Sequence, residues 1–296
     1  MSWRTPLPVS MKKTWLFPDY SQAEVRVAAW AGPIPLMKQW FKSDEDIHIN
    51  VARLIGETVE KHKVHIPPLS VGLPPPWGRK HWSLLNAEDP LDHDIERDLS
   101  KRTVHANTNG MHRQRFSRIT KVPLMYAGII QDMYHGLFPE IRGSYHTWIV
   151  DSAVANHGTL ENPWHWRRTF YKVNPLTGQY DEDEKRVMYA WYPQSTIGMM
   201  TIRFWRRICE VFRDDKQIKI YTPEAIRDMG IDAQLQVHDA IGASVPDEDS
   251  VVADIARAMK REGEVELIIK GDPLIVPIDF KRGYSWGDLK TYKIPG

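Results

Sequence analysis

The sequence predicts an α+β fold in which an antiparallel sheet is interrupted by a long helical segment. Three observations support this prediction. An apolar run at 15–17 lies near the start of the chain, helical patterning fills most of the middle, and residues 232–280 show the period-2 alternation typical of strands. This order of strand, helices and strands places the first strand in a sheet completed by the last third of the chain.

The chain is expected to begin with a buried strand at Trp15–Phe17 and a helix at Ser21–Trp30. Ser21-Gln22-Ala23-Glu24 has the pattern of a capping box, which predicts that this helix starts just past Asp19. Gly32-Pro33-Ile34-Pro35 ends the helix, and a second helix follows.

Irregular stretches divide the rest of the chain. Residues 65–91 are rich in proline and lack periodicity, so we expect a long surface loop there. Asn174–Asp183 has the composition of a hairpin or loop. The other expected elements, in chain order, are a helix opened by Asp46-Ile47-His48, a helix from about Ile95, mostly helix over 121–170 with breaks at Phe138-Pro139 and near Asn162-Pro163, a helix at 184–213, strands at 232–238 and 241–245, a helix at 250–261 and a strand at 274–280.

The composition is ordinary for a globular protein. The chain has 296 residues, of which 42% are hydrophobic and 26% are charged, and its net charge is +1. No apolar run approaches the roughly 20 residues that span a bilayer, and no signal peptide is visible. The single cysteine, Cys209, excludes an internal disulfide and fits a reducing compartment. We therefore expect a cytoplasmic protein with no membrane partner.

Two aspartates follow strand-like segments far apart in the sequence. Asp19 comes directly after an apolar strand and before a helix, and Asp239 lies between two alternating segments that read as the arms of a hairpin. Each aspartate alone could be an ordinary turn or cap residue. Together, two carboxylates on rigid strand ends are suitable ligands for a pair of divalent metal ions, as nucleotidyl transfer requires.

A helix between these aspartates carries a polar stripe. Arg97, Lys101, His105 and Asn109 are spaced four residues apart and therefore share one helix face. The surrounding stretch, 97–121, contains seven Lys or Arg and one acid. Such a stripe is often a solvated face, but arginine and lysine can also bind a triphosphate.

In this order, the segments resemble motifs A, B and C of the family A (DNA polymerase I type) DNA polymerases. The sequences of these motifs are most similar to those of phage versions of the enzyme. Asp19-Tyr20-Ser21-Gln22-Ala23-Glu24-Val25-Arg26 resembles motif A, the helix at 95–110 resembles motif B, and Gln236-Val237-His238-Asp239 resembles motif C. Further likenesses are Asp46-Ile47-His48, Arg186 with Pro193-Gln194-Ser195-Thr196, and 280–290. The resemblance covers about residue 10 to the end, with 57–94 unmatched.

The resemblance implies a palm sheet and a helical fingers subdomain. The expected division is 1–43 as the first part of the palm, 44–185 as the fingers including the proline-rich insertion, and 186–296 as the second part of the palm. The implied activity is template-directed DNA synthesis from dNTPs on primer–template DNA, with two Mg²⁺ ions and Mn²⁺ as a substitute.

The resemblance also implies site roles. Asp19 and Asp239 would be catalytic and would hold the metals with the Tyr20 carbonyl. Glu24 would exclude a ribose 2′-hydroxyl. The other implied nucleotide contacts are Gln22, Arg97, Lys101, His105 and His238, and the implied DNA contacts are Asn109, Arg186, Gln194 and Gln236.

Several positions depart from the family pattern. His105 and Asn109 replace aromatic residues of motif B, and Ala240 replaces the glutamate that usually follows the motif C aspartate. Motif A begins at residue 19, so the family's thumb and any exonuclease are expected on a separate N-terminal subunit of a split, phage-encoded polymerase. The alternative interpretation is a catalytically inactive remnant that acts as a DNA-binding or replisome-interaction module.

Overall fold

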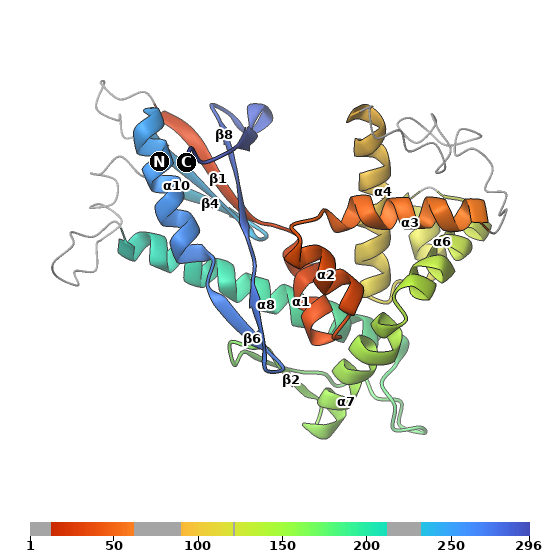
Figure 1. The fold of residues 1–296 in the computed structure, drawn as a ribbon. Helices are drawn as coiled ribbons and strands as arrows, with labels where there is room; N and C mark the ends of the chain where they lie inside the picture. The colour runs from red at the N-terminus through yellow and green to blue at the C-terminus, as the bar shows by residue number, and fades with distance from the viewer. Residues whose placement is uncertain (1–12, 62–89, 121, 212–231) are drawn as a thin grey trace, which may run out of the picture. The chain divides into compact units, whose positions relative to one another are not determined.

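The computed structural model describes residues 13–61, 90–120, 122–211 and 232–296. The chain divides into two compact units, one formed by Met1–Ala23 with Ser195–Gly296 and the other by Glu24–Gln194 (Figure 1). The first bound lies before the predicted palm–fingers boundary at 43/44, and the second lies after the one predicted at 185/186. The identity of each unit as palm or fingers remains a prediction.

The first unit is built on an antiparallel sheet, as the sequence predicts, and the described residues contribute five strands to it. Its strand order is β4-β5-β1-β8-β9. The strands are β1 (Lys13–Tyr20), β4 (Asp232–Val237), β5 (Ala240–Pro246), β8 (Ile278–Gly283) and β9 (Lys290–Tyr292). The first strand in sequence is therefore the central one, flanked by strands from the last third of the chain.

A helix from the last third of the chain covers part of this sheet. Helix α10 (Asp249–Gly263) packs against β1, β5 and β8 (Figure 1). Its buried side chains, including Val252, Ile255 and Met259, recur at helical spacing, while its N- and C-terminal turns carry Asp249 and the pair Lys260 and Arg261. These charges lie at the ends that the helix dipole favours.

The predicted strand at 274–280 is wrong as a single element. The chain instead forms a separate hairpin from β6 (Glu266–Ile269) and β7 (Asp272–Ile275), and β8 begins only at Ile278. Lys270 and Gly271 connect the hairpin with φ of 52° and 82°, the two positive values that a type I′ turn requires. A proline at 277 interrupts the alternation, since it has no N–H for a ladder hydrogen bond.

The start of the first helix also differs from prediction. Helix α1 (Ala23–Ala31) begins two residues after Ser21, and Gln22 has a left-handed φ of 52°. Gln22 is therefore not the first helical residue that the predicted capping box requires.

The second unit is mostly helical. Besides most of α1, its described helices include α2 (Pro35–Lys42), α3 (Ile47–Lys61), α4 (Pro90–Thr108), α5 (Arg113–Thr120), α6 (Leu124–Leu137), the π-helix η2 (Ile141–His146) and α7 (Thr147–Ala155). The side chain of Asp46 caps α3 as predicted, because its Oδ1 accepts hydrogen bonds from the backbone N–H of His48 and Ile49. The predicted insertion 65–91 lies outside the described residues except for its last two, which begin α4.

Aromatic packing forms much of the core of this unit. The ring of Phe138, at the predicted break after α6, meets Tyr134 at a centroid distance of 5.1 Å and Trp40 of α2 at 5.8 Å. Both Tyr134 and Phe138 are fully buried. The contact between Trp40 and Phe138 joins helices that are distant in sequence, and aromatic rings in such contacts bury a large apolar area.

A long helix, α8 (Glu182–Val211), contains Pro193 without a break. Proline has no N–H to donate to the carbonyl four residues earlier, which here belongs to Tyr189. The hydroxyl of Tyr145, fully buried on η2, donates to that carbonyl at 2.6 Å instead. A tertiary hydrogen bond therefore replaces the missing helical one.

Two short strands, β2 (Thr159–Glu161) and β3 (Arg167–Thr169), form a hairpin that the sequence did not predict. The predicted break at Asn162 is the turn between them, since its Oδ1 accepts hydrogen bonds from the N–H groups of Trp164 and Trp166. The predicted hairpin or loop at 174–183 is confirmed up to residue 181, as a turn closed by a bridge between Val173 and Tyr180, whereas its last two residues already belong to α8. In the described part of the chain, no helix is both long enough and apolar enough to cross a membrane.

Candidate active site

Strand pairing in the first unit brings the two predicted catalytic aspartates to the same end of the sheet. Asp19 lies near the end of β1, and its Cα partner on β5 is Ala240. Asp239 is the residue before Ala240, and its carbonyl accepts a hydrogen bond from the N–H of Tyr20 at 3.4 Å. Asp19 and Asp239 therefore occupy neighbouring positions on adjacent strand ends.

The hairpin that holds Asp239 has a strained tip. His238 and Asp239 form the loop between β4 and β5, and His238 has a φ of 54°. This left-handed conformation is uncommon for residues other than glycine and often accompanies functional sites. The side chain of His238 is exposed, whereas that of Asp239 is half-buried.

Tyr20 is fixed next to Asp19 by contacts within the first unit. Its hydroxyl donates to the carbonyl of Gly263 at 2.9 Å, and its ring packs edge-on against Phe204 at 5.8 Å. Burial and then the charge of Glu264 raise the pKa of Tyr20, so its hydroxyl remains a neutral donor. These contacts orient the backbone that carries the Asp19 carboxylate and the Tyr20 carbonyl.

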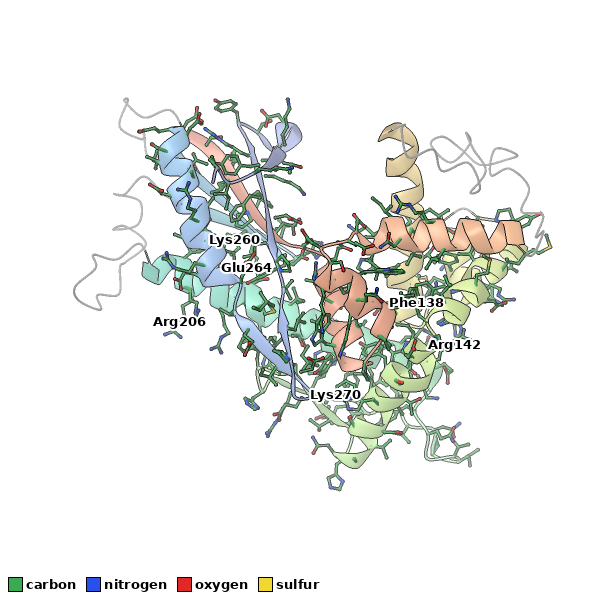
Figure 2. All side chains as sticks on the ribbon, viewed as in Figure 1. Phe138, Arg142, Arg206, Lys260, Glu264 and Lys270 are labelled. Carbon is green, nitrogen blue, oxygen red and sulfur yellow. The ribbon has the colours of Figure 1, made fainter. Side chains whose placement is uncertain are left out.

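Glu264 in turn joins α10 to β8. Its Oε1 accepts hydrogen bonds from Lys260 Nζ at 2.5 Å and from the Ile278 N–H at 2.9 Å. Lys260 and Glu264 are labelled near the end of α10 in Figure 2. The helix end and the start of β8 are thereby held together beside Tyr20.

A lysine that the sequence did not single out lies beside Asp19. Lys281 Nζ is 3.6 Å from Asp19 Oδ2, and the two side chains are 46% and 33% exposed. The contact depends on the β1–β8 register, in which Lys281 is the Cα partner of Phe17 and Asp279 that of Asp19. No local pattern could have identified Lys281, because the contact arises from strands at opposite ends of the chain.

The carboxylates fit hard divalent cations by their chemistry. Carboxylate and carbonyl oxygens are the ligands that Mg²⁺ prefers, and the cationic group beside Asp19 shows that a positive charge is accommodated there. Among the residues that the structure describes, no group of three or more His, Cys, Asp or Glu side chains could hold a metal. Asp19 and Asp239 would therefore need oxygens from water or substrate to complete a coordination shell.

In the second unit, three residues of the predicted polar stripe border one hollow. Lys101, His105 and Asn109 line a pocket of about 370 Å³ whose other walls are Arg102, Ala106, Met111 and Ile119. Lys101 is exposed, while His105 and Asn109 are half-buried. Arg97 lies on the same helix, α4, but its side chain is outside the described part of the structure.

His105 contacts two other polar side chains of this unit. Its Nδ1 is 3.8 Å from Glu24 Oε2, and its ring stacks on that of the buried His48 at a centroid distance of 6.0 Å. Burial and then the charge of Lys101 lower the pKa of His105 to about 4. The imidazole is consequently neutral at pH 7, so its contact with Glu24 is polar rather than ionic and it adds no charge to a triphosphate site.

The remaining predicted residues are distributed over both units. Gln22 and Gln236 belong to the first unit, half-buried and exposed respectively. Gln194 is exposed in the second. Arg186, on the first turns of α8, forms an ion pair with Asp183 and contacts His112. Arg186 is thus held in place by two side chains of its own unit.

A larger pocket of about 570 Å³ adjoins this region of the second unit. Its wall includes the loop at 110–112, Arg113 at the start of α5, and the side chains of Lys185 and Tyr189. His146 stacks on Tyr189 at 3.8 Å, and its Nε2 lies 2.8 Å from the Thr108 carbonyl. The charged residues that line this pocket are of both signs: Arg113, Arg142, Lys185, Asp132, Asp151 and Glu182.

Comparison with solved structures identifies the fold. The chain is similar to the POL domain of Pol1 from M. smegmatis, solved in complex with DNA primer-template and dNTP, with a TM-score of 0.61 and 17% sequence identity. The match covers 94% of this chain and 41% of that one, so the chain spans about two fifths of its length. No protein-family model and no curated protein matches the sequence. The chain therefore has the α+β fold of a DNA polymerase domain.

Proposed function

We propose that the protein catalyses template-directed DNA synthesis, transferring a nucleotide from a dNTP to a primer 3′-hydroxyl as the palm and fingers of a family A polymerase. The observation that supports this most directly is the register that puts Asp19 and Asp239 on neighbouring strand ends. The likeness to a domain solved with primer-template and dNTP supports the same activity.

The carboxylates of Asp19 and Asp239, with the Tyr20 carbonyl, would hold two Mg²⁺ ions. When bound, such ions supply charge neutralisation and Lewis-acid polarisation at the transferring phosphate. The contribution of the protein is positional: Tyr20 is anchored to Gly263, and the hairpin tip at His238 fixes Asp239. Lys281 would limit how strongly Asp19 attracts a cation.

Nucleotide binding is proposed for both units. Lys101 and Arg97 would neutralise the triphosphate, because their cationic groups bind phosphate oxygens. Glu24 would exclude a ribose 2′-hydroxyl, and the neutral His105 beside it would contact the sugar as a hydrogen-bonding group that adds no charge of its own. Gln22 and His238 would complete the nucleotide contacts.

Primer–template contacts are proposed for four polar residues: Asn109, Arg186, Gln194 and Gln236. Arg186 is already oriented by Asp183 and His112, so little side-chain freedom would be lost on binding. The proposal also includes a thumb, which grips the duplex, on a separate partner subunit of a phage-type split enzyme.

A second candidate function is a catalytically inactive module that binds DNA or a replisome protein. It is favoured by one observation, that the described residues contain no group of three or more potential metal ligands. The two candidates differ in whether Asp19 and Asp239 are needed for anything beyond folding.

Primer extension tests the proposal. The chain would be assayed on a primed template with Mg²⁺, alone and with a candidate thumb-bearing polypeptide, beside Asp19→Asn and Asp239→Asn. Asp254→Asn is the matched control, since Asp254 is an exposed acid of the same unit, 77% exposed and paired with Arg257. Each site variant should lose roughly 10³-fold or more in rate, since metal ligation contributes several kcal/mol. DNA binding without extension in any mixture would favour the inactive module.

A further inference from the structure

A surface rich in aromatic and basic side chains lies outside every predicted site residue. It consists of the β2–β3 hairpin and the segment after it, and we name its exposed residues His165, Trp166, Arg167, Arg168, Tyr171 and Lys172 the aromatic–basic hairpin. Residues 157–180 contain three Lys or Arg and one acid, Glu161, a net charge of +2. The whole hairpin belongs to the second unit.

Glu161 orients two of these side chains. Its Oε1 is 2.6 Å from His165 Nδ1, and its Oε2 accepts a hydrogen bond from Arg167 Nε at 2.5 Å. These hydrogen bonds, to His165 first, lower the pKa of Glu161, so it remains a carboxylate. Arg167 is bound through Nε and is 69% exposed, which leaves the outer edge of its guanidinium available for a bidentate contact with phosphate.

The other cations extend the charged surface. Arg168 lies over the ring of Phe170 at 5.0 Å and is the Cα partner of Leu160. Successive strand residues point to opposite faces, so Arg167 and Arg168 present their charges on both sides of the hairpin. A flexible single strand can follow both faces, whereas a stiff duplex meets one of them.

Two aromatic side chains are left in solvent on the same surface. Trp166 is 53% exposed and Tyr171 is 80% exposed. The backbone N–H of Tyr171 donates to Glu184 Oε1 at 3.1 Å, so the residue is anchored although its ring is free of the core. Exposed aromatic rings among cations are the composition of surfaces that bind single-stranded nucleic acid, where unpaired bases stack on the rings.

We propose that the aromatic–basic hairpin binds single-stranded DNA, with Trp166 and Tyr171 stacking on bases and Arg167, Arg168 and Lys172 contacting phosphates. An acidic protein segment would use the cations but would have no need of the two rings. The proposal rests on the proposed function only for the source of the strand, which would be the unpaired part of the template.

The test is the affinity of the complete chain for fluorescein-labelled oligothymidine, measured by fluorescence anisotropy over a range of salt concentrations. Trp166→Leu and Tyr171→Leu should each weaken binding about 5- to 150-fold, the range for one base–aromatic stack. Trp166→Phe keeps a ring and should retain most of the affinity. Arg168→Gln should reduce the slope of log affinity against log salt by about 0.7, as for one lost phosphate contact on a single strand.

Two control variants keep the comparison specific. Lys42→Gln removes an exposed cation of the same unit on α2, and Leu176→Ala removes a 94% exposed apolar side chain from the neighbouring turn. Both should bind oligothymidine like the unaltered protein. Circular dichroism of each variant would verify that the fold is retained.

Unchanged binding in both leucine variants would overturn the proposal. A competition with poly-glutamate, added at the same concentration of negative charges as the oligothymidine, provides a second test. The proposal would also be overturned if poly-glutamate displaced oligothymidine and bound the leucine variants as tightly as the unaltered protein, since the surface would then be one that binds acidic peptides. Asp19→Asn should bind oligothymidine normally. If primer extension fails while oligothymidine binding still depends on the aromatic–basic hairpin, only the polymerase proposal is contradicted. If primer extension is normal while the hairpin variants bind oligothymidine as tightly as the unaltered protein, only the single-strand proposal is contradicted.

Discussion

Replacing Lys281 by methionine should increase the apparent affinity of the site for Mg²⁺. Lys281 Nζ is 3.6 Å from Asp19 Oδ2, and both side chains are partly exposed, at 46% and 33%. Two unit charges at this separation interact by about 1 kcal/mol in a water-like dielectric, in line with the range measured for exposed pairs. Removing the ammonium group removes both its competition for Asp19 and its repulsion of a cation.

The expected result is a fall of about two- to fivefold in the Mg²⁺ concentration that gives half-maximal primer extension, because about 1 kcal/mol corresponds to about fivefold. The effect should shrink as salt is raised, since exposed charges are screened. Lys281→Arg keeps the charge and should resemble the unaltered protein. Lys290→Met removes an exposed lysine of β9, another strand of the sheet, and should leave the Mg²⁺ dependence unchanged.

If the Mg²⁺ concentration for half-maximal extension is unchanged or higher in Lys281→Met, this reasoning is refuted. Unchanged dependence would mean that Asp19 does not bind the metal or that Lys281 turns away in solution. A higher Mg²⁺ concentration for half-maximal extension would mean that Lys281 supports the site, for instance by orienting the Asp19 carboxylate. Manganese binding followed by electron paramagnetic resonance would measure affinity without relying on activity.

Three further predictions concern the stability of the second unit. Burial lowers the pKa of His146, which is 8% exposed, to about 4. As pH falls, the unfolded chain takes up this proton before the folded chain does, so up to about 3 kcal/mol of the stability present above pH 6.5 should be lost between about pH 6.5 and 4. In urea titrations, the free energy of unfolding of His146→Gln should depend less on pH than that of the unaltered protein. Gly110→Ala should lower the free energy of unfolding by about 1–3 kcal/mol, because φ at Gly110 is +67° and a Cβ there would lie 2.9 Å from the Tyr189 ring. Gly136→Ala should not lower it, because a Cβ at Gly136 would have no atom within 4 Å. Equal melting temperatures for the two variants would contradict this prediction. Tyr145→Phe should lower the free energy of unfolding by about 1–3 kcal/mol, since it leaves the buried Tyr189 carbonyl without its donor, and an unchanged denaturation midpoint would show that water or a helix shift replaces the hydroxyl.

The order of elements could be predicted because it depends on local patterns. The apolar run around Leu16 and the alternation on either side of Asp239 mark strands whatever they pair with, and the structure confirms both. Asp46 caps the helix it was expected to open, since an Asx cap uses only neighbouring N–H groups. The β2–β3 hairpin was missed because each of its strands has three residues, too few for a period to be recognised.

Turn conformation was harder to predict than element type. The pattern Ser21–Glu24 satisfies a capping box on paper, but Gln22 adopts a left-handed conformation and the helix starts one residue later than the box requires. The chain at Ser21 is bound elsewhere, since its N–H donates to the Pro277 carbonyl at 2.8 Å. A long-range hydrogen bond thus overrides a local preference.

By itself, the sequence determined the fold class, the positions of Asp19 and Asp239 at strand ends and the stripe that includes Lys101 and His105, because these depend on residue type and spacing along one chain. Only the tertiary structure decided which groups surround them. It showed that Lys281 approaches Asp19, that His105 is neutral beside Glu24 and that the Tyr145 hydroxyl supports the helix at Pro193. These features arise from strand register, burial and contacts between distant segments, and no local pattern of residues encodes them.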